Sequence, residues 1–103
     1  MGFITPEECK SAEDVRNQID KIDHRIMKLY GERHKYVEEI VRFKHDEEGI
    51  IANDRRIQVI KDRRKWAQEN GLDAETFEKM YNLLIENNIQ RELEILKEKQ
   101  KKS

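Results

Sequence analysis

The segment 30–50, YGERHKYVEEIVRFKHDEEGI, contains the end of an amphipathic helix and the break that follows it. Counted back to residue 15 at about 3.6 residues per turn, nine positions fall on one face of this helix. Seven of the nine are apolar and two are cationic, so the pattern predicts a long helix with two charges on the face it should bury. The nine positions are Val15, Ile19, Ile22, Ile26, Leu29, Arg33, Val37, Ile40 and Lys44.

The two cations on this stripe allow two interpretations. A charge in a helical interior is costly unless it is paired. Arg33 and Lys44 can extend their charged ends to solvent, or pair with an acid such as Glu92 in a buried network. Alternatively, they converge on an anionic ligand held between helices, as inward-facing side chains of helical bundles do. The pattern alone leaves both interpretations open.

Three helices are expected in all. Ser11 is a candidate N-cap for the first, which we expect to run to about residue 44, after a short leading turn at TPEE (5–8). HDEEGI (45–50) is expected to form a loop at Gly49. Asn53 or Asp54 can cap a second helix that stops near ENG (69–71). Asp73 can cap a third, whose stripe carries the polar residues Asn88 and Glu92.

The length of the first helix predicts a partner chain. About 32 helical residues span about 48 Å, whereas a compact domain of this size has a radius of gyration of only about 13 Å. The other helices of one chain cannot cover such a stripe, and symmetric dimers are the commonest assembly. We therefore expect an all-α fold with three helices per chain in an entwined homodimeric bundle.

Composition narrows the class of protein. The 103 residues are 42% charged with a net charge of −1, which gives no general affinity for nucleic acid. Cys9 is the only cysteine, and no signal peptide or membrane span is recognisable, so a cytoplasmic location is expected. The three histidines lack ligand spacing, so no metal site is expected. We expect a single domain over residues 1–103, with a leader at 1–10 and a frayed tail at 97–103.

Three stretches carry a resemblance to a known family. They are VRNQIDKIDHRIMKLYGER (15–33), RFK (42–44) and WAQENGLDAETF (66–77), and the similarity extends from TPEEC (5–9) to about residue 96. The chain resembles the all-helical class of chorismate mutases, and especially the short subgroup that includes isochorismate-pyruvate lyases. The resemblance implies an entwined homodimer that acts on a dianionic substrate without a cofactor.

The resemblance also implies a site. Arg16 would reach across from the partner chain to bind one substrate carboxylate, and Arg33 would bind the other. Lys44 would contact the ether oxygen of the breaking bond. Arg55 would assist binding, while Asn88 and Glu92 would complete the polar contacts. An apolar wall would be formed by Val37, Ile40, Ile51, Val59 and Ile89.

Two positions depart from the typical mutase pattern. Glu92 stands where a glutamine is common, so its carboxyl should act in the protonated form; burial would raise its pKa and Lys44 would lower it. Arg56 stands where typical mutases have a glutamate, and the lyase subgroup also lacks that glutamate. Chorismate mutase is the expected activity, with isochorismate-pyruvate lyase as the alternative. A non-catalytic helical interaction module is the alternative of a different class.

Overall fold

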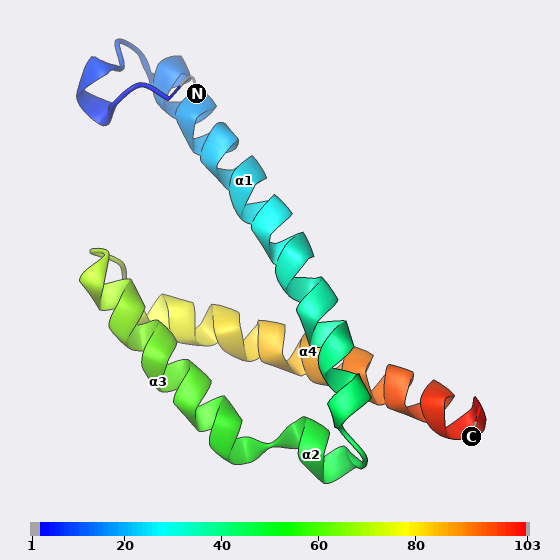
Figure 1. Cartoon of the computed structure of the whole chain (residues 1–103). Helices are drawn as coiled ribbons and strands as arrows, with labels where there is room; N and C mark the ends of the chain where they lie inside the picture. Colours follow the sequence, from blue (N-terminus) through cyan, green and yellow to red (C-terminus); the bar gives the residue numbers. More distant parts are fainter. Residues whose placement is uncertain (1–2, 103) are drawn as a thin grey trace. The chain divides into compact units, whose positions relative to one another are not determined.

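The computed structural model describes residues 3–102, and all regular structure within that range is helical (Figure 1). Three helices are long: α1 (Ala12–Glu39), α3 (Asn53–Glu69) and α4 (Ala74–Lys102). Shorter elements are the 3₁₀ turns η1 (Pro6–Glu8) and η2 (Ile40–Phe43) and the helix α2 (Glu47–Ile51). The all-α prediction with three main helices is confirmed. The chain divides into two compact units, Met1–Lys35 and Tyr36–Ser103. The single domain over 1–103 stays a prediction.

Local capping signals define the helix starts. Ser11 Oγ accepts a hydrogen bond from the N–H of Asp14 at 3.1 Å, as expected of an N-cap. Asp73 Oδ2 accepts one from the N–H three residues later at 3.0 Å. In the leading turn, Glu8 Oε1 accepts the N–H of Thr5 at 2.8 Å. All three predicted starts are confirmed because each depends only on neighbouring residues.

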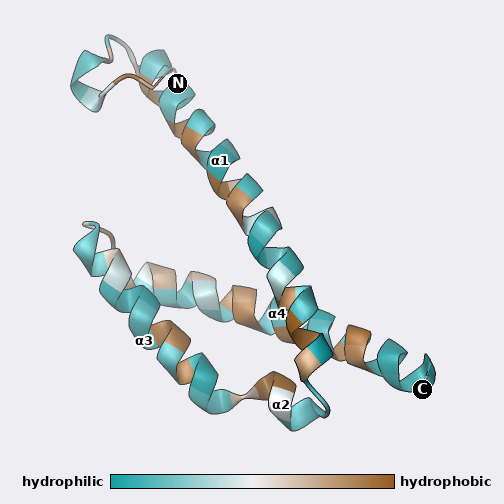
Figure 2. Cartoon of the chain, in the orientation of Figure 1, coloured by the Kyte–Doolittle hydropathy of each residue, from teal (hydrophilic) through white to brown (hydrophobic). Residues whose placement is uncertain are grey.

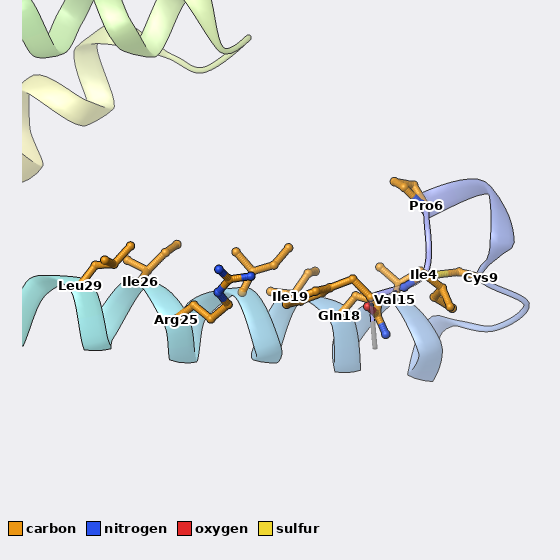
Figure 3. A pocket seen from close by; sticks show the side chains of 11 residues that line it. Ile4, Pro6, Cys9, Val15, Gln18, Ile19, Arg25, Ile26 and Leu29 are labelled. Atoms are coloured by element: carbon orange, nitrogen blue, oxygen red, sulfur yellow. Dashed lines mark hydrogen bonds between the residues drawn. The ribbon is translucent and has the colours of Figure 1, made fainter. Parts of the chain in front are cut away.

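In the first unit, an apolar stripe on α1 is open to solvent. Its residues are between 39% and 62% exposed and lie along one face of the helix, where they line a groove (Figures 2 and 3). The leader lies at the start of this face, where the N–H of Ile4 donates to Gln18 Oε1 at 3.2 Å. The first unit therefore has an extensive apolar surface that its own residues leave uncovered. We call this surface the α1 stripe; it consists of Val15, Ile19, Ile22, Ile26 and Leu29.

In the second unit, α4 packs against α3, α2 and η2. Arg64 Nη1 on α3 lies 2.6 Å from Glu78 Oε1 on α4, and Arg91 Nε on α4 lies 2.7 Å from Glu38 Oε2. These partly exposed ion pairs add little stability, so apolar packing holds the unit together. Its core cluster is Val41, Ile50 and Leu96, with Ile89, Leu93 and Ile95 packed against it.

The expected single helix to residue 44 is wrong in its last turn. α1 ends at Glu39, and η2 carries the chain to Phe43 with a tighter turn of about three residues. The tighter turn rotates the side chains relative to the α-helical stripe. Val41 is 1% exposed whereas Ile40, the residue the stripe placed inward, is 42% exposed. Lys44 is the C-cap, with extended backbone (φ −106°, ψ 139°).

Two further expectations are corrected near residue 50. The expected loop at 45–50 contains the start of α2, because Asp46 Oδ1 accepts the N–H of Gly49 at 2.8 Å and so acts as an N-cap. Neither Asn53 nor Asp54 caps α3; its N-cap is Ala52, in the left-handed region at φ 36°. One left-handed residue between α2 and α3 therefore replaces the expected polar cap.

At the C-terminal end, α4 is helical to Lys102, and the expected frayed tail at 97–103 stays a prediction. Met1, Gly2 and Ser103, which belong to the expected leader and tail, lie outside the described residues. Within the described range, no helix combines the length and the apolar character needed to cross a membrane.

Candidate active site

The central feature of the second unit is a buried acid beside a lysine. Glu92, on α4, is only 9% exposed. Burial raises the pKa of the Glu92 carboxyl above its ordinary value of 4.5, and the nearby positive charge of Lys44 lowers that pKa by a smaller amount. The net shift favours the neutral acid, which can donate a hydrogen bond at a pH where an exposed glutamate would be ionised. The charge of Lys44 therefore acts on Glu92, and of the two opposing effects on the Glu92 pKa burial is the larger.

Local contacts hold the backbone around Lys44 and Glu92. Asn88, one turn before Glu92 on α4, is 8% exposed, so both polar side chains lie on the buried face of this helix. The N–H of Lys44 donates to Val41 O at 3.0 Å, which closes η2. A Cβ added at Gly49 of α2 would lie 3.5 Å from Lys44 Cδ, so the aliphatic part of the lysine runs beside that glycine. Lys44, at the end of η2, and the amide and carboxyl of α4 thus belong to the same unit.

The five expected wall residues differ in burial. Val59 on α3 is buried, and Ile89 on α4 is half-buried against the core cluster. Val37 is half-buried, while Ile40 and Ile51 are exposed. The neighbours of the two exposed isoleucines, at positions 41 and 50, take the core positions instead. All five expected wall residues belong to the second unit, as do the lysine and the acid.

The arginines divide between the two units. Arg16 is exposed and Arg33 is half-buried, and both are on the part of α1 that belongs to the first unit. Arg55, in the first turn of α3, is exposed.

The neighbouring Arg56 is engaged within the second unit. Its Nε and Nη2 donate to Asn82 Oδ1 at 3.3 and 3.1 Å, and Nη2 also lies 3.2 Å from Glu86 Oε1. Arg56 thus ties α3 to α4, a role that the sequence pattern did not indicate. Among residues 3–102, no group of three or more His, Cys, Asp or Glu side chains is arranged to hold a metal ion.

Comparison with known proteins assigns the chain to a family. A family profile described as "Chorismate mutase type II" matches residues 15–93, which are more than three quarters of the chain. The chain belongs to the chorismate mutase type II family. Every candidate site residue named above falls inside the matched stretch. The resemblance seen in the sequence is therefore confirmed.

Two relatives within this similarity carry different activities in their names. The isochorismate pyruvate lyase of Pseudomonas aeruginosa is 41% identical over 81 residues, which cover 79% of this chain and 80% of the relative. The chorismate mutase of Methanocaldococcus jannaschii is 35% identical over 92 residues, which cover 87% of this chain and 92% of the relative. Membership of the family therefore does not by itself choose between the two reactions.

One contact near the lysine falls outside the family match. Lys99, six residues beyond the matched stretch, directs its ammonium group at carbonyl oxygens of η2 and Lys44. Sequence analysis assigned residue 99 to a frayed tail and missed it. The available signal was its spacing of seven residues from Glu92, which places the two side chains on one helix face.

Proposed function

We propose that this protein is a chorismate mutase that converts chorismate to prephenate, the step that leads to aromatic amino acids. The observation that carries the proposal is the buried carboxyl of Glu92 beside Lys44, in a chain of the chorismate mutase type II family. The reaction is a [3,3] rearrangement: the ether C–O bond breaks, a C–C bond forms, and no covalent intermediate or cofactor is required. Negative charge grows on the ether oxygen as the bond breaks.

The polar residues would lower the barrier in two ways. Arg33, with Arg16 of a second chain, would hold the two carboxylates and so keep the substrate in its compact reactive conformer. Lys44 and the protonated Glu92 would both donate to the ether oxygen as it gains charge, which is electrostatic stabilisation of the transition state. Asn88 and Arg55 would complete the polar contacts. The apolar wall of Val37, Ile40, Ile51, Val59 and Ile89 would exclude water.

The spacing of the two arginines supports a homodimer. Arg16 and Arg33 are separated by 17 residues of α1, or about 25 Å along the helix axis. Two carboxylates of one small molecule cannot bridge that distance, so a site that uses both arginines must take them from two chains. The exposed α1 stripe has the apolar character that such a partner would cover.

An acid placed in the α1 stripe should therefore break the assembly. Ile22→Asp puts a charge on this surface, and we expect the dimer to dissociate to monomers in sedimentation velocity at micromolar concentration. The matched control is Asn17→Asp, which adds the same charge to an exposed position of the same helix about half a turn away from the stripe. A dimer that survives Ile22→Asp, or a monomeric wild-type protein, would contradict the proposed assembly.

Isochorismate-pyruvate lyase is the second candidate. The relative from Pseudomonas aeruginosa bears that name and shares 41% of the aligned residues. This reaction also breaks the ether bond of a dianionic substrate, with a hydrogen passing to the enolpyruvyl group and salicylate and pyruvate as products. Lys44 and Glu92 could assist that step in the same way. Because Arg56 is engaged with Asn82 and Glu86, we expect other contacts to decide between the two substrates.

A product assay distinguishes the candidates. Purified protein is offered chorismate and isochorismate separately between about pH 5 and pH 8, and prephenate and salicylate are quantified. We expect prephenate from chorismate as the dominant product. Dominant salicylate from isochorismate would make the protein a lyase of salicylate metabolism, and no product from either substrate would favour a helical interaction module.

A further inference from the structure

One ammonium group on α4 meets three carbonyl oxygens at the end of η2. Lys99 Nζ lies 3.5 Å from Val41 O, 3.5 Å from Arg42 O and 3.4 Å from Lys44 O. Carbonyls at a helix C-terminus carry partial negative charge, and most of them lack intrahelical partners; of these three, Val41 O also accepts the N–H of Lys44. A lysine ammonium satisfies both needs at once. Lys99 therefore joins the end of η2 to α4.

The segment that Lys99 holds is the one that carries Lys44. Lys44 lies where the chain leaves η2, and its own carbonyl is one of the three acceptors. Its N–H is bound to Val41 O, and its side chain runs beside Gly49. The direction of the Lys44 side chain thus depends on a short, non-α-helical segment with few backbone bonds of its own. A contact that fixes this segment also fixes where the Lys44 ammonium can reach.

The same helix carries Glu92, the buried acid of the proposed site. Lys99 follows Glu92 by seven residues, or two helical turns, which places both on one side of α4 about 10.5 Å apart along its axis. Between them, Leu96 is buried in the core cluster with Val41. One continuous helix therefore sets the position of Glu92 and anchors the backbone of Lys44.

We propose that Lys99 is a positioning residue for the reaction: it holds the carbonyls of residues 41, 42 and 44 so that the Lys44 ammonium stays beside Glu92 and the ether oxygen of the substrate. This inference rests on the proposed function, since it deepens the role of the same site. It assigns no substrate contact to Lys99 itself. Its consequence is that the last turns of α4, beyond the stretch shared with the family profile, are needed for full turnover.

The first test measures the backbone without substrate. Lys99→Met removes the donor and keeps the aliphatic stem, Lys99→Arg restores donors, and Lys97→Met is a matched control at an exposed lysine on the same helix. Losing the contact should speed hydrogen exchange at the Lys44 amide about fivefold, as for a hydrogen bond of ordinary net strength. Lys99→Arg should restore slow exchange, and Lys97→Met should leave exchange unchanged. Unchanged exchange in Lys99→Met would overturn the inference whatever the activity proves to be.

The second test asks whether Lys99 acts through Lys44. We expect Lys99→Met to lower kcat between about 10-fold and 100-fold, as for a catalytic group moved out of place. In a Lys44→Met background the same substitution should have almost no further effect, because the group it positions is absent. A merely structural role would give additive losses in this double-mutant cycle, and additivity would overturn the inference. If Lys99→Met does not fold, Lys99→Gln takes its place in both tests.

The two tests separate the inference from the function on which it rests. If the wild-type protein turns over neither chorismate nor isochorismate, the proposed function fails. The exchange experiment would then still decide whether Lys99 holds the backbone of residues 41–44. If the wild-type protein is active and the cycle is additive, the function stands and the positioning role fails.

Discussion

Lys44→Met is expected to lower kcat about 10²–10³-fold, the loss typical of removing one preorganised donor from a developing oxyanion. The positive charge of this lysine lowers the pKa of the buried Glu92, and its stem runs along Gly49. Methionine keeps the shape of the stem and removes the charge, so the loss reports electrostatics rather than packing. Steady-state kinetics with chorismate and with isochorismate would measure it.

A stability measurement completes this experiment. Burying a charge is costly, so thermal unfolding of Lys44→Met should occur at the same temperature as in the wild-type protein or a higher one. Lys61→Met, at an exposed lysine of α3, is the matched control and should change neither quantity. A kcat within about threefold of wild type, far less than a lost oxyanion donor should cost, would contradict a role for Lys44 in the reaction. If the wild-type protein is folded but turns over neither chorismate nor isochorismate, the helical interaction module would be favoured.

Glu92→Gln is expected to remove the pH dependence of the reaction while keeping its rate. Burial raises the pKa of Glu92, so the carboxyl is a hydrogen-bond donor below the raised pKa and a repelling anion above it. The wild-type kcat/KM should therefore fall as the pH rises through that pKa. Glutamine donates at every pH, so the variant should show no such fall and should equal or exceed the wild-type rate at neutral pH.

The same substitution has a signature in stability. Because the folded-state pKa of Glu92 is raised, the folded protein binds this proton more tightly than the unfolded chain does. The free energy of unfolding should then decrease as the pH rises from about 4.5, the ordinary value for glutamate, to the folded-state pKa. Glu92→Gln should lack this decrease, so its advantage over wild type should grow across that window.

An exposed acid on the same helix provides the control for both measurements. Glu98→Gln removes a carboxyl six residues further along α4, and we expect it to leave the pH profiles of rate and stability as in wild type. A large loss of activity in Glu92→Gln at every pH would contradict the protonated-donor role. A wild-type rate that does not depend on pH in this range would contradict it as well.

The features that could be predicted from sequence are those that depend on neighbouring residues. Ser11, Glu8 and Asp73 each accept the N–H of a residue three positions away, so their capping roles follow from local geometry. The apolar spacing along residues 15–29 predicted the α1 stripe for the same reason, since helical period alone decides which side chains share a face. The same patterns predicted an all-α fold. They also placed the polar residues Lys44 and Glu92 on helix faces that were expected to be buried.

The rest was decided by contacts between distant parts of the chain. Tightening of the helix after Glu39 places Val41 rather than Ile40 against α4, because the last turn adapts to the core formed with Leu96. Whether Glu92 is biased toward its acid form depends on the balance between burial and the charge of Lys44, which has no local signature.

Lys99 is the clearest case. Composition marked residues 97–103 as a solvated end, but the carbonyls at 41, 42 and 44 supply partners more than fifty positions away. The helical period thus determined which residues share a face. Tertiary packing determined which of those faces are buried and which charged groups come into contact, because desolvation and long-range contacts depend on the whole unit.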